Sequence, residues 1–311
     1  GEERSFARAS GRPRRPRPAK PRWTPRAWRA QAVPVRAIPA LLLLAAPALA
    51  HDLPLGDGRL STEEPRPGYV LACRRDFPGG GGAHAAGPWI RNGRWHPEER
   101  PQVEGRVAWP EARLSVALEG PERVLRLNRL PLHETGEYPI RPGSAAHRWD
   151  RNPNRITAAE VVARLPAAPV PLAQPLCVPM GVIGWALSGA AIFNAFDLAG
   201  RDAPAWEIQD LCNGHPERNG VYHYHDWSPC LARFATSEDA PVGWMLDGFP
   251  ILGPVDTAGR EVTNADLDEC HGRVGEVEIA PGRRVTTYHY RFTREFPYTL
   301  GCFRAAPARR P

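Results

Sequence analysis

The sequence predicts a mainly β protein with a minor α+β character. We expect two similar β units that arose by internal duplication, preceded by an N-terminal β-rich region. Two repeated strings carry this prediction: Tyr-His-Tyr-His at 222–225 returns as Tyr-His-Tyr-Arg at 288–291, and Gly-Trp-Ala-Leu-Ser-Gly at 184–189 returns as Gly-Trp-Met-Leu-Asp-Gly at 243–248. Short β-branched and aromatic runs bounded by glycine turns, typical of strands, support it.

The two predicted units span about 176–235 and 236–304, within a domain at 176–304. In each, two apolar runs flank a Ser-Gly or Asp-Gly pair, which is a β-hairpin signal. A polar loop with cysteine and glycine follows, and then the Tyr-His-Tyr strand. Matching positions keep their order at offsets of 59, 58 and 66 residues. We expect the units to pack about a pseudo-twofold axis.

The region 51–166 is also predicted to be mostly β. Residues 113–118 alternate, 119–121 turn, and 124–127 return as a second strand. Thr157 to Leu165 is predicted as a short helix, because Thr157 and Glu160 have the spacing of a capping box. The Pro- and Ala-rich stretch 166–175 is predicted to link the two halves.

Residues 1–50 are predicted to be a leader outside the mature protein. Residues 36–50 combine an arginine, a short apolar core and Ala-Leu-Ala, the pattern of a signal peptide cleaved after Ala50. The predicted location is therefore secreted or periplasmic. The leader holds ten arginines, one lysine and two glutamates, a net +9, so the whole-chain charge of +6 leaves 51–311 at −3. That balance predicts no nucleic-acid partner, and no later segment is long and apolar enough for a membrane helix. Other partners stay unknown.

Six cysteines follow the leader, and an even number in an exported chain predicts disulfides. Six cysteines allow fifteen pairings, and the sequence alone does not select one. We favour pairs within each unit, Cys212–Cys230 and Cys270–Cys302, which leaves Cys73–Cys177 to join the two halves.

Three histidines within eleven residues form the candidate site: His215, His223 and His225. His223 and His225 share one face of a strand because side chains alternate with a period of two. Three imidazoles match an open metal site and suit Zn, Cu, Fe or Ni. Asp210 or Asp226 could orient an imidazole. The alternative interpretation is a polar strand face without metal.

The second unit is chemically different at the same places. Arginine replaces two of the three histidines, at Arg273 and Arg291, which favours a structural or anion-binding role. His271 and His289 are additional candidate ligands if they fold back toward the first unit.

Several uncommon strings occur in order: Cys-Asn-Gly-His-Pro at 212–216, the tetrapeptide at 222–225, Leu-Asp-Gly-Phe-Pro-Ile at 246–251 and Gly-Cys-Phe at 301–303. Through them the chain resembles the YHYH-domain family of exported proteins over about 176–304. The resemblance implies the domain limits and an exported location, but it says little about activity.

Three hypotheses of function follow. The first is an exported metal-binding protein that uses the histidine cluster; the metal would be a divalent ion such as Zn, Cu or Fe. The second is a metal-dependent hydrolase of a polymer or ester. The third is a metal-free, disulfide-braced binding module. The sequence has no nucleophile elbow, phosphate loop or dinucleotide fingerprint, so whether the protein is an enzyme, and with which catalytic residues, stays open.

Overall fold

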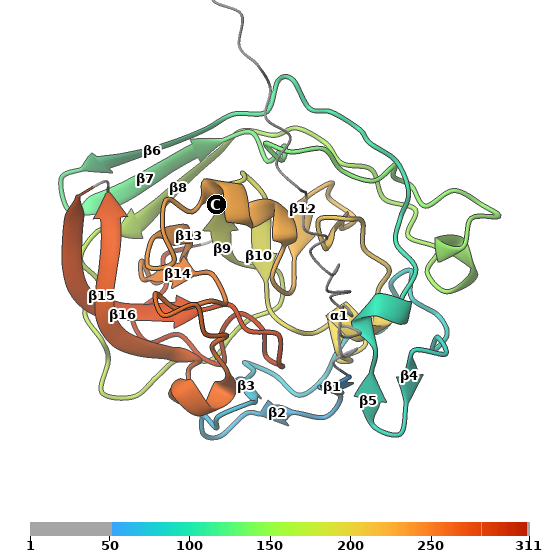
Figure 1. Ribbon diagram of the computed structural model, residues 1–311, viewed down its shortest axis with the longest axis horizontal. Coiled ribbons are helices and arrows are strands. Elements are labelled where there is room, and N and C mark those ends of the chain that lie inside the picture. Colours follow the sequence, from blue (N-terminus) through green and yellow to red (C-terminus); the bar gives the residue numbers. More distant parts are fainter. Residues whose placement is uncertain (1–51, 281, 310–311) are drawn as a thin grey trace, which may run out of the picture. The chain divides into compact units, whose positions relative to one another are not determined.

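Both Tyr-His-Tyr segments are strands of one eight-stranded sheet (Figure 1). The computed structural model describes residues 52–280 and 282–309 of the protein. The sheet order is β11-β12-β10-β9-β13-β14-β16-β15. Its strands are β9 (Val182–Ala186), β10 (Ala191–Phe193), β11 (Gly214–Pro216), β12 (Tyr222–Tyr224), β13 (Pro241–Met245), β14 (Pro250–Leu252), β15 (Gly272–Ala280) and β16 (Arg283–Arg291).

The two halves of this sheet have the same pairing pattern. The hairpins β9–β10 and β13–β14 are antiparallel, and the second strand of each pairs in parallel with a Tyr-His-Tyr strand, β12 or β16. Each Tyr-His-Tyr strand pairs antiparallel with the strand before it. The halves join through β9 and β13. This arrangement is what the predicted duplication requires, although common descent of the two units stays a proposal.

Glycine closes both hairpins for a physical reason. Gly189 and Gly248 have φ of 83° and 87°, a conformation that costs other residues energy. A Cβ at Gly248 would also lie 2.3 Å from the Pro166 carbonyl oxygen. The Ser-Gly and Asp-Gly pairs are therefore turns, as predicted.

A second sheet confirms the predicted strands of the N-terminal region and corrects one prediction. It contains β6 (Leu114–Glu119), β7 (Glu122–Leu127) and β8 (Val161–Pro166). The helix expected over 157–165 is wrong, because its second half is β8. Ala163 and Leu165 are buried at a period of two and pair with β7. Tertiary pairing thus outweighs the local capping signal.

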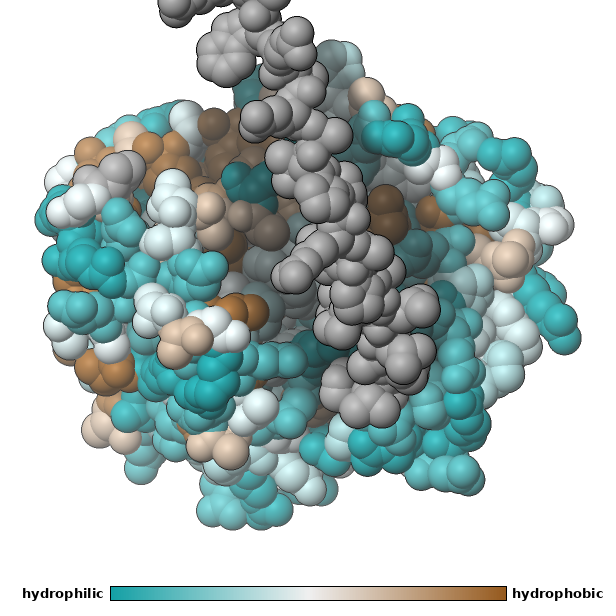
Figure 2. Space-filling view, viewed as in Figure 1, coloured by the Kyte–Doolittle hydropathy of each residue, from teal (hydrophilic) through white to brown (hydrophobic). Residues whose placement is uncertain are grey.

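The remaining elements are short. They are β1 (Leu53–Pro54), β2 (Leu60–Ser61), β3 (Val70–Leu71), β4 (Ile90–Arg91), β5 (Arg94–Trp95), α1 (Ala203–Trp206) and the 3-10 turns η1 (Pro97–Glu99), η2 (Ala146–Arg148), η3 (Pro229–Phe234) and η4 (Asn264–Asp266). With 32% strand and 7% helix, the mainly β prediction is confirmed. Hydrophobic residues gather in Figure 2 where Figure 1 places β6–β8.

All six cysteines are paired, in the combination favoured above: Cys73–Cys177, Cys212–Cys230 and Cys270–Cys302. Three disulfides indicate an oxidising compartment. The predicted leader and its cleavage point lie outside the described residues. Within the described part, no helix has the length and apolar character needed to cross a membrane.

The described residues fall in one compact unit, and its core runs through both sheets. Buried aromatic side chains from the N-terminal region, such as Trp89 and Trp95, belong to the same core as Tyr222 and Tyr290. The division into 51–166 and 176–304 therefore stays a proposal about the sequence.

Candidate metal site

The structure brings the three predicted histidines together. His215 on β11 lies opposite His223 on β12, and His225 follows at the end of β12. Each is at most 3% exposed. One nitrogen from each ring lies within 4.8 Å of the other two. The strand alternation inferred from the sequence therefore does produce a converging cluster.

Backbone carbonyls fix two of the rings. His223 Nδ1 lies 3.0 Å from the Val221 carbonyl oxygen, and His225 Nδ1 lies 2.5 Å from that of Asn194. Carbonyl oxygens only accept, so both Nδ1 atoms carry protons and both neutral Nε2 atoms are bare acceptors. These two Nε2 atoms face each other at 3.1 Å. Two lone pairs at this separation repel unless a cation or an added proton lies between them.

An added proton is unfavourable here. Burial lowers the pKa of His215 and His223 well below the ordinary value, with the neighbouring imidazoles adding to the effect. Burial also lowers the pKa of His225 to about 4. All three rings are therefore neutral near pH 7, which is the form that binds metal ions.

Glu207 supplies a fourth donor that sequence reasoning missed. It follows α1, and its Oε2 lies 3.4 Å from His215 Nε2 and 3.3 Å from His225 Nε2. Burial raises the pKa of this carboxyl group well above its usual range. Among the described residues, Glu207 Oε2 has no hydrogen-bond partner, and the same holds for both ring nitrogens of His215. A single glutamate between a short helix and a loop has no sequence pattern that would have identified it.

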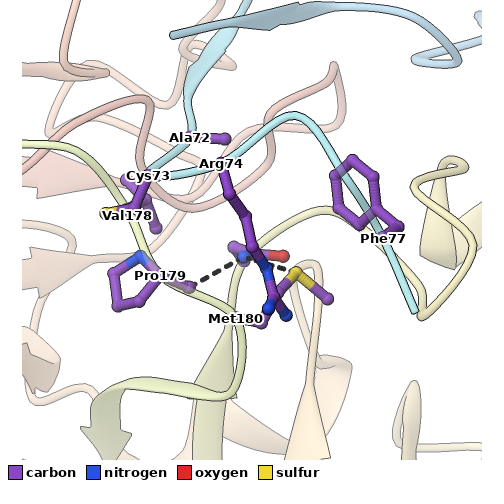
Figure 3. A pocket seen from close by; sticks show the side chains of 8 residues that line it. Ala72, Cys73, Arg74, Phe77, Val178, Pro179 and Met180 are labelled. Atoms are coloured by element: carbon purple, nitrogen blue, oxygen red, sulfur yellow. Dashed lines mark hydrogen bonds between the residues drawn. The ribbon is translucent and has the colours of Figure 1, made fainter.

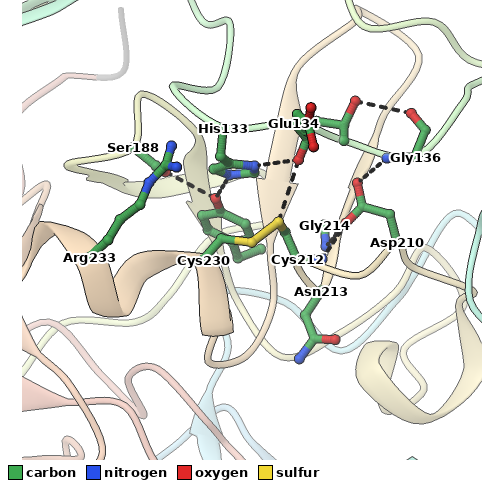
Figure 4. The surroundings of a disulfide bond; sticks show 12 residues. His133, Glu134, Gly136, Ser188, Asp210, Cys212, Asn213, Gly214, Cys230 and Arg233 are labelled. Atoms are coloured by element: carbon green, nitrogen blue, oxygen red, sulfur yellow. Dashed lines mark hydrogen bonds between the residues drawn. A yellow bond between two sulfur atoms is a disulfide. The ribbon is translucent and has the colours of Figure 1, made fainter. Parts of the chain in front are cut away.

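The predicted orienting role of Asp210 and Asp226 is wrong: neither hydrogen-bonds to an imidazole in the part of the chain described. Asp210 lies behind the sheet and accepts the Tyr222 hydroxyl at 2.9 Å from both carboxylate oxygens. It also accepts backbone N–H groups of Gly136, Cys212 and Gly214 (Figure 4). Asp210 thus anchors the strand through its tyrosine face and not through a histidine.

Tyr224 is held on that same opposite face. Its hydroxyl bonds to Ser188 Oγ at 3.0 Å and to His133 Nε2, beside the Cys212–Cys230 disulfide (Figure 4). His133 and the two sulfur atoms also lie close together. Because both sulfurs are oxidised, that second cluster offers no thiolate and is not a metal site.

Asn194 positions the carbonyl that holds His225. Its side-chain amide donates to the Pro179 carbonyl oxygen at 2.9 Å and to Met180 Sδ at 3.4 Å (Figure 3). Its Oδ1 accepts the backbone N–H of Phe196 at 2.9 Å. The ring orientation of His225 is therefore determined by a side chain next to a smaller pocket, which Arg74 and Phe77 line.

A cavity of about 990 Å³ reaches the cluster. The three histidines and Glu207 line it, together with an apolar wall that includes Val182 and Trp185. Phe193 stacks on His223 with ring centroids 3.8 Å apart. The site can therefore receive a ligand of considerable size.

The other two candidate histidines do not join the cluster. His289 lies on β16, and four strands separate β16 from β12 in the sheet. His271 bonds to Thr293 Oγ1 through Nε2 at 3.0 Å. Neither belongs to the three-histidine group.

One comparison with known proteins found a match to the segment that contains the cluster. A family model described as YHYH protein matches residues 205–264. This segment includes Glu207 and all three clustered histidines. No curated protein and no solved structure matches the chain.

Proposed function

We propose that this protein is an exported metal-binding protein that holds one divalent transition-metal ion between His215, His223 and His225. Glu207 is the fourth donor in this proposal. Three imidazole nitrogens and one carboxylate oxygen suit zinc, and also copper or iron. The export signal and the domain limits at 51–166 and 176–304 belong to the same proposal.

One observation carries it: the bare Nε2 atoms of His223 and His225 face each other at 3.1 Å. Nitrogen ligands about 2.0–2.1 Å from a tetrahedral zinc ion would be roughly 3.3 Å apart. The spacing thus fits ligands of one ion, and the carbonyl bonds at both Nδ1 atoms are the outer partners that such ligands usually have.

Metal content of the purified chain tests the proposal. We expect one ion per chain after dialysis against zinc. His223→Gln should lower the zinc affinity at least about 100-fold, because loss of a residue that only supports a ligand already lowers metal affinity by up to about that factor. His271→Asn is the matched control, because His271 is equally buried but lies outside the cluster. A folded wild-type chain without metal would favour the metal-free binding module instead.

A metal-dependent hydrolase is the second candidate, favoured by the large cavity that reaches Glu207. A bound metal ion would supply Lewis acidity there. Glu207 would take a proton from the attacking nucleophile, since its Oε2 has no hydrogen-bond partner among the described residues. Glu207→Gln distinguishes its two roles: loss of ester hydrolysis with the metal retained identifies a base, whereas loss of the metal identifies a ligand.

A further inference from the structure

The second unit places a different set of side chains at the positions of the histidine cluster. Arg273 lies opposite His289 in the β15–β16 register, as His215 lies opposite His223 in β11–β12. Arg291 follows His289 by two residues, as His225 follows His223. The correspondence is one of position in the sheet and does not depend on how the two units arose.

The hydrogen bonds that aim these side chains are also alike. His289 Nδ1 lies 3.4 Å from the Thr287 carbonyl oxygen, two residues back, as His223 Nδ1 approaches that of Val221. Arg291 Nη1 donates to the carbonyl oxygens of Gly253 at 2.9 Å and Val255 at 2.7 Å. Gly253 directly follows β14 as Asn194 directly follows β10, and the Asn194 carbonyl oxygen holds His225. The second unit therefore holds His289 and Arg291 as the first unit holds His223 and His225, and the strand register places Arg273 beside them.

The charge at this place is not balanced by the described part of the protein. Arg291 is 2% exposed and forms no ion pair there, although a buried charge is costly without a partner. The acids that act on it electrostatically are Asp256 and Glu238. Asp256 is paired with Arg260 at 3.0 Å and accepts two backbone N–H groups. Arg273 adds a second positive charge that also has no carboxylate within ion-pair distance among the described residues.

Two buried polar atoms are left without partners. They are Arg291 Nε, a donor, and His289 Nε2. Buried polar atoms usually have hydrogen-bond partners, so each unpaired one requires an explanation. Arg273 is only partly buried, so the site has contact with solvent beside it. A Cβ at residue 275 would lie 3.0 Å from His289 Cε1, so Gly275 leaves room for the imidazole.

We propose that Arg273, His289 and Arg291 form an oxyanion site, which binds the phosphate or carboxylate group of a ligand. Arginine guanidinium groups are the side chains best suited to such groups, because they donate several hydrogen bonds in a planar fork. The site is separate from the histidine cluster and does not depend on metal binding there.

Isothermal titration of the full chain with inorganic phosphate tests this, at constant ionic strength set by chloride. Neutral 1,10-phenanthroline keeps metal ions out of the histidine cluster without adding an anion. We expect one phosphate per chain with a Kd of about 1 mM or tighter, and at least about a tenfold weaker Kd in Arg273→Gln, since one charge-assisted hydrogen bond contributes that much.

Arg283→Gln is the matched control, because Arg283 is an exposed arginine at the start of β16, the strand that carries His289 and Arg291, and it should leave the Kd unchanged. Near-ultraviolet circular dichroism verifies that both variants are folded. Acetate in a parallel titration identifies the ligand class: binding of acetate but not phosphate, lost in Arg273→Gln, indicates a carboxylate ligand. The proposal is overturned if neither anion binds, or if Arg273→Gln and Arg283→Gln behave alike.

Discussion

Replacing Tyr222 with phenylalanine tests how the histidine strand is anchored. The Tyr222 side chain is fully buried, and its hydroxyl donates to Asp210 on the face opposite His223. Phenylalanine keeps the ring and its packing, so the change removes one hydrogen bond. Asp210 retains its three backbone donors and is not left bare.

A hydrogen bond to a charged group contributes about 1.5–3 kcal/mol, and a bond between neutral groups about 0.5–1.5 kcal/mol. We therefore expect Tyr222→Phe to lower the free energy of unfolding by about 2 kcal/mol at pH 8. For a domain of this size that corresponds to a Tm lower by about 4–8 °C. Tyr224→Phe is the comparison: it removes two hydrogen bonds between neutral groups, to Ser188 and His133, and should cost about 2 kcal/mol with little dependence on pH.

The pH dependence sharpens the test. Burial raises the pKa of Asp210 to about 6. The Tyr222 hydroxyl stabilises the ionised carboxylate, so the cost of Tyr222→Phe should be full at pH 8, decline as the pH passes through 6, and approach about 1 kcal/mol at pH 5. Urea unfolding at both pH values measures it. A cost of Tyr222→Phe that is the same at pH 5 as at pH 8, or larger at pH 5, would refute the reasoning.

Three further predictions concern other contacts. Asn194→Ala removes the three side-chain hydrogen bonds with Pro179, Met180 and Phe196 and frees the carbonyl that aims His225; zinc affinity should fall about 10–100-fold, and an unchanged affinity in equilibrium dialysis would contradict this. Burial lowers the pKa of His271 to about 3, so the unfolded chain binds one proton more between about pH 3 and 6.5, and stability falls as the pH drops through that range. Between pH 8 and pH 5 the wild type should therefore lose about 2 kcal/mol more of its free energy of unfolding than His271→Asn does, as measured by urea unfolding. Equal losses in the two proteins would count against it. Replacing Cys73 and Cys177 by serine opens a loop of 104 residues and should cost about 4–5 kcal/mol in the chain-entropy model, with a loss below about 1 kcal/mol arguing against it.

Local periodicity was sufficient to predict β6, β7, the hairpins of both units, the two Tyr-His-Tyr strands and the histidine face. Alternation in a strand requires His223 and His225 to share a side, and glycine after serine or aspartate requires a turn. The same local reasoning failed at 157–165. There a capping signal and an alternating pattern competed, and pairing with β7, which is far away in the sequence, decided the outcome.

The sequence by itself determined the β class and the three candidate histidines, because these follow from side-chain period, turn chemistry and repeated spacing; the cysteine pairs that it favoured were established only by the tertiary structure. Only the tertiary structure decided which acids accompany them. Glu207 reaches the cluster from the residue that follows α1, outside the repeated strands, while Asp210 turns to the tyrosine face. The direction in which such a side chain points depends on how distant segments of the chain pack, and the position of the residue in the sequence does not encode it. For the same reason, the unpaired charge of Arg291 became visible only when its buried neighbours were known.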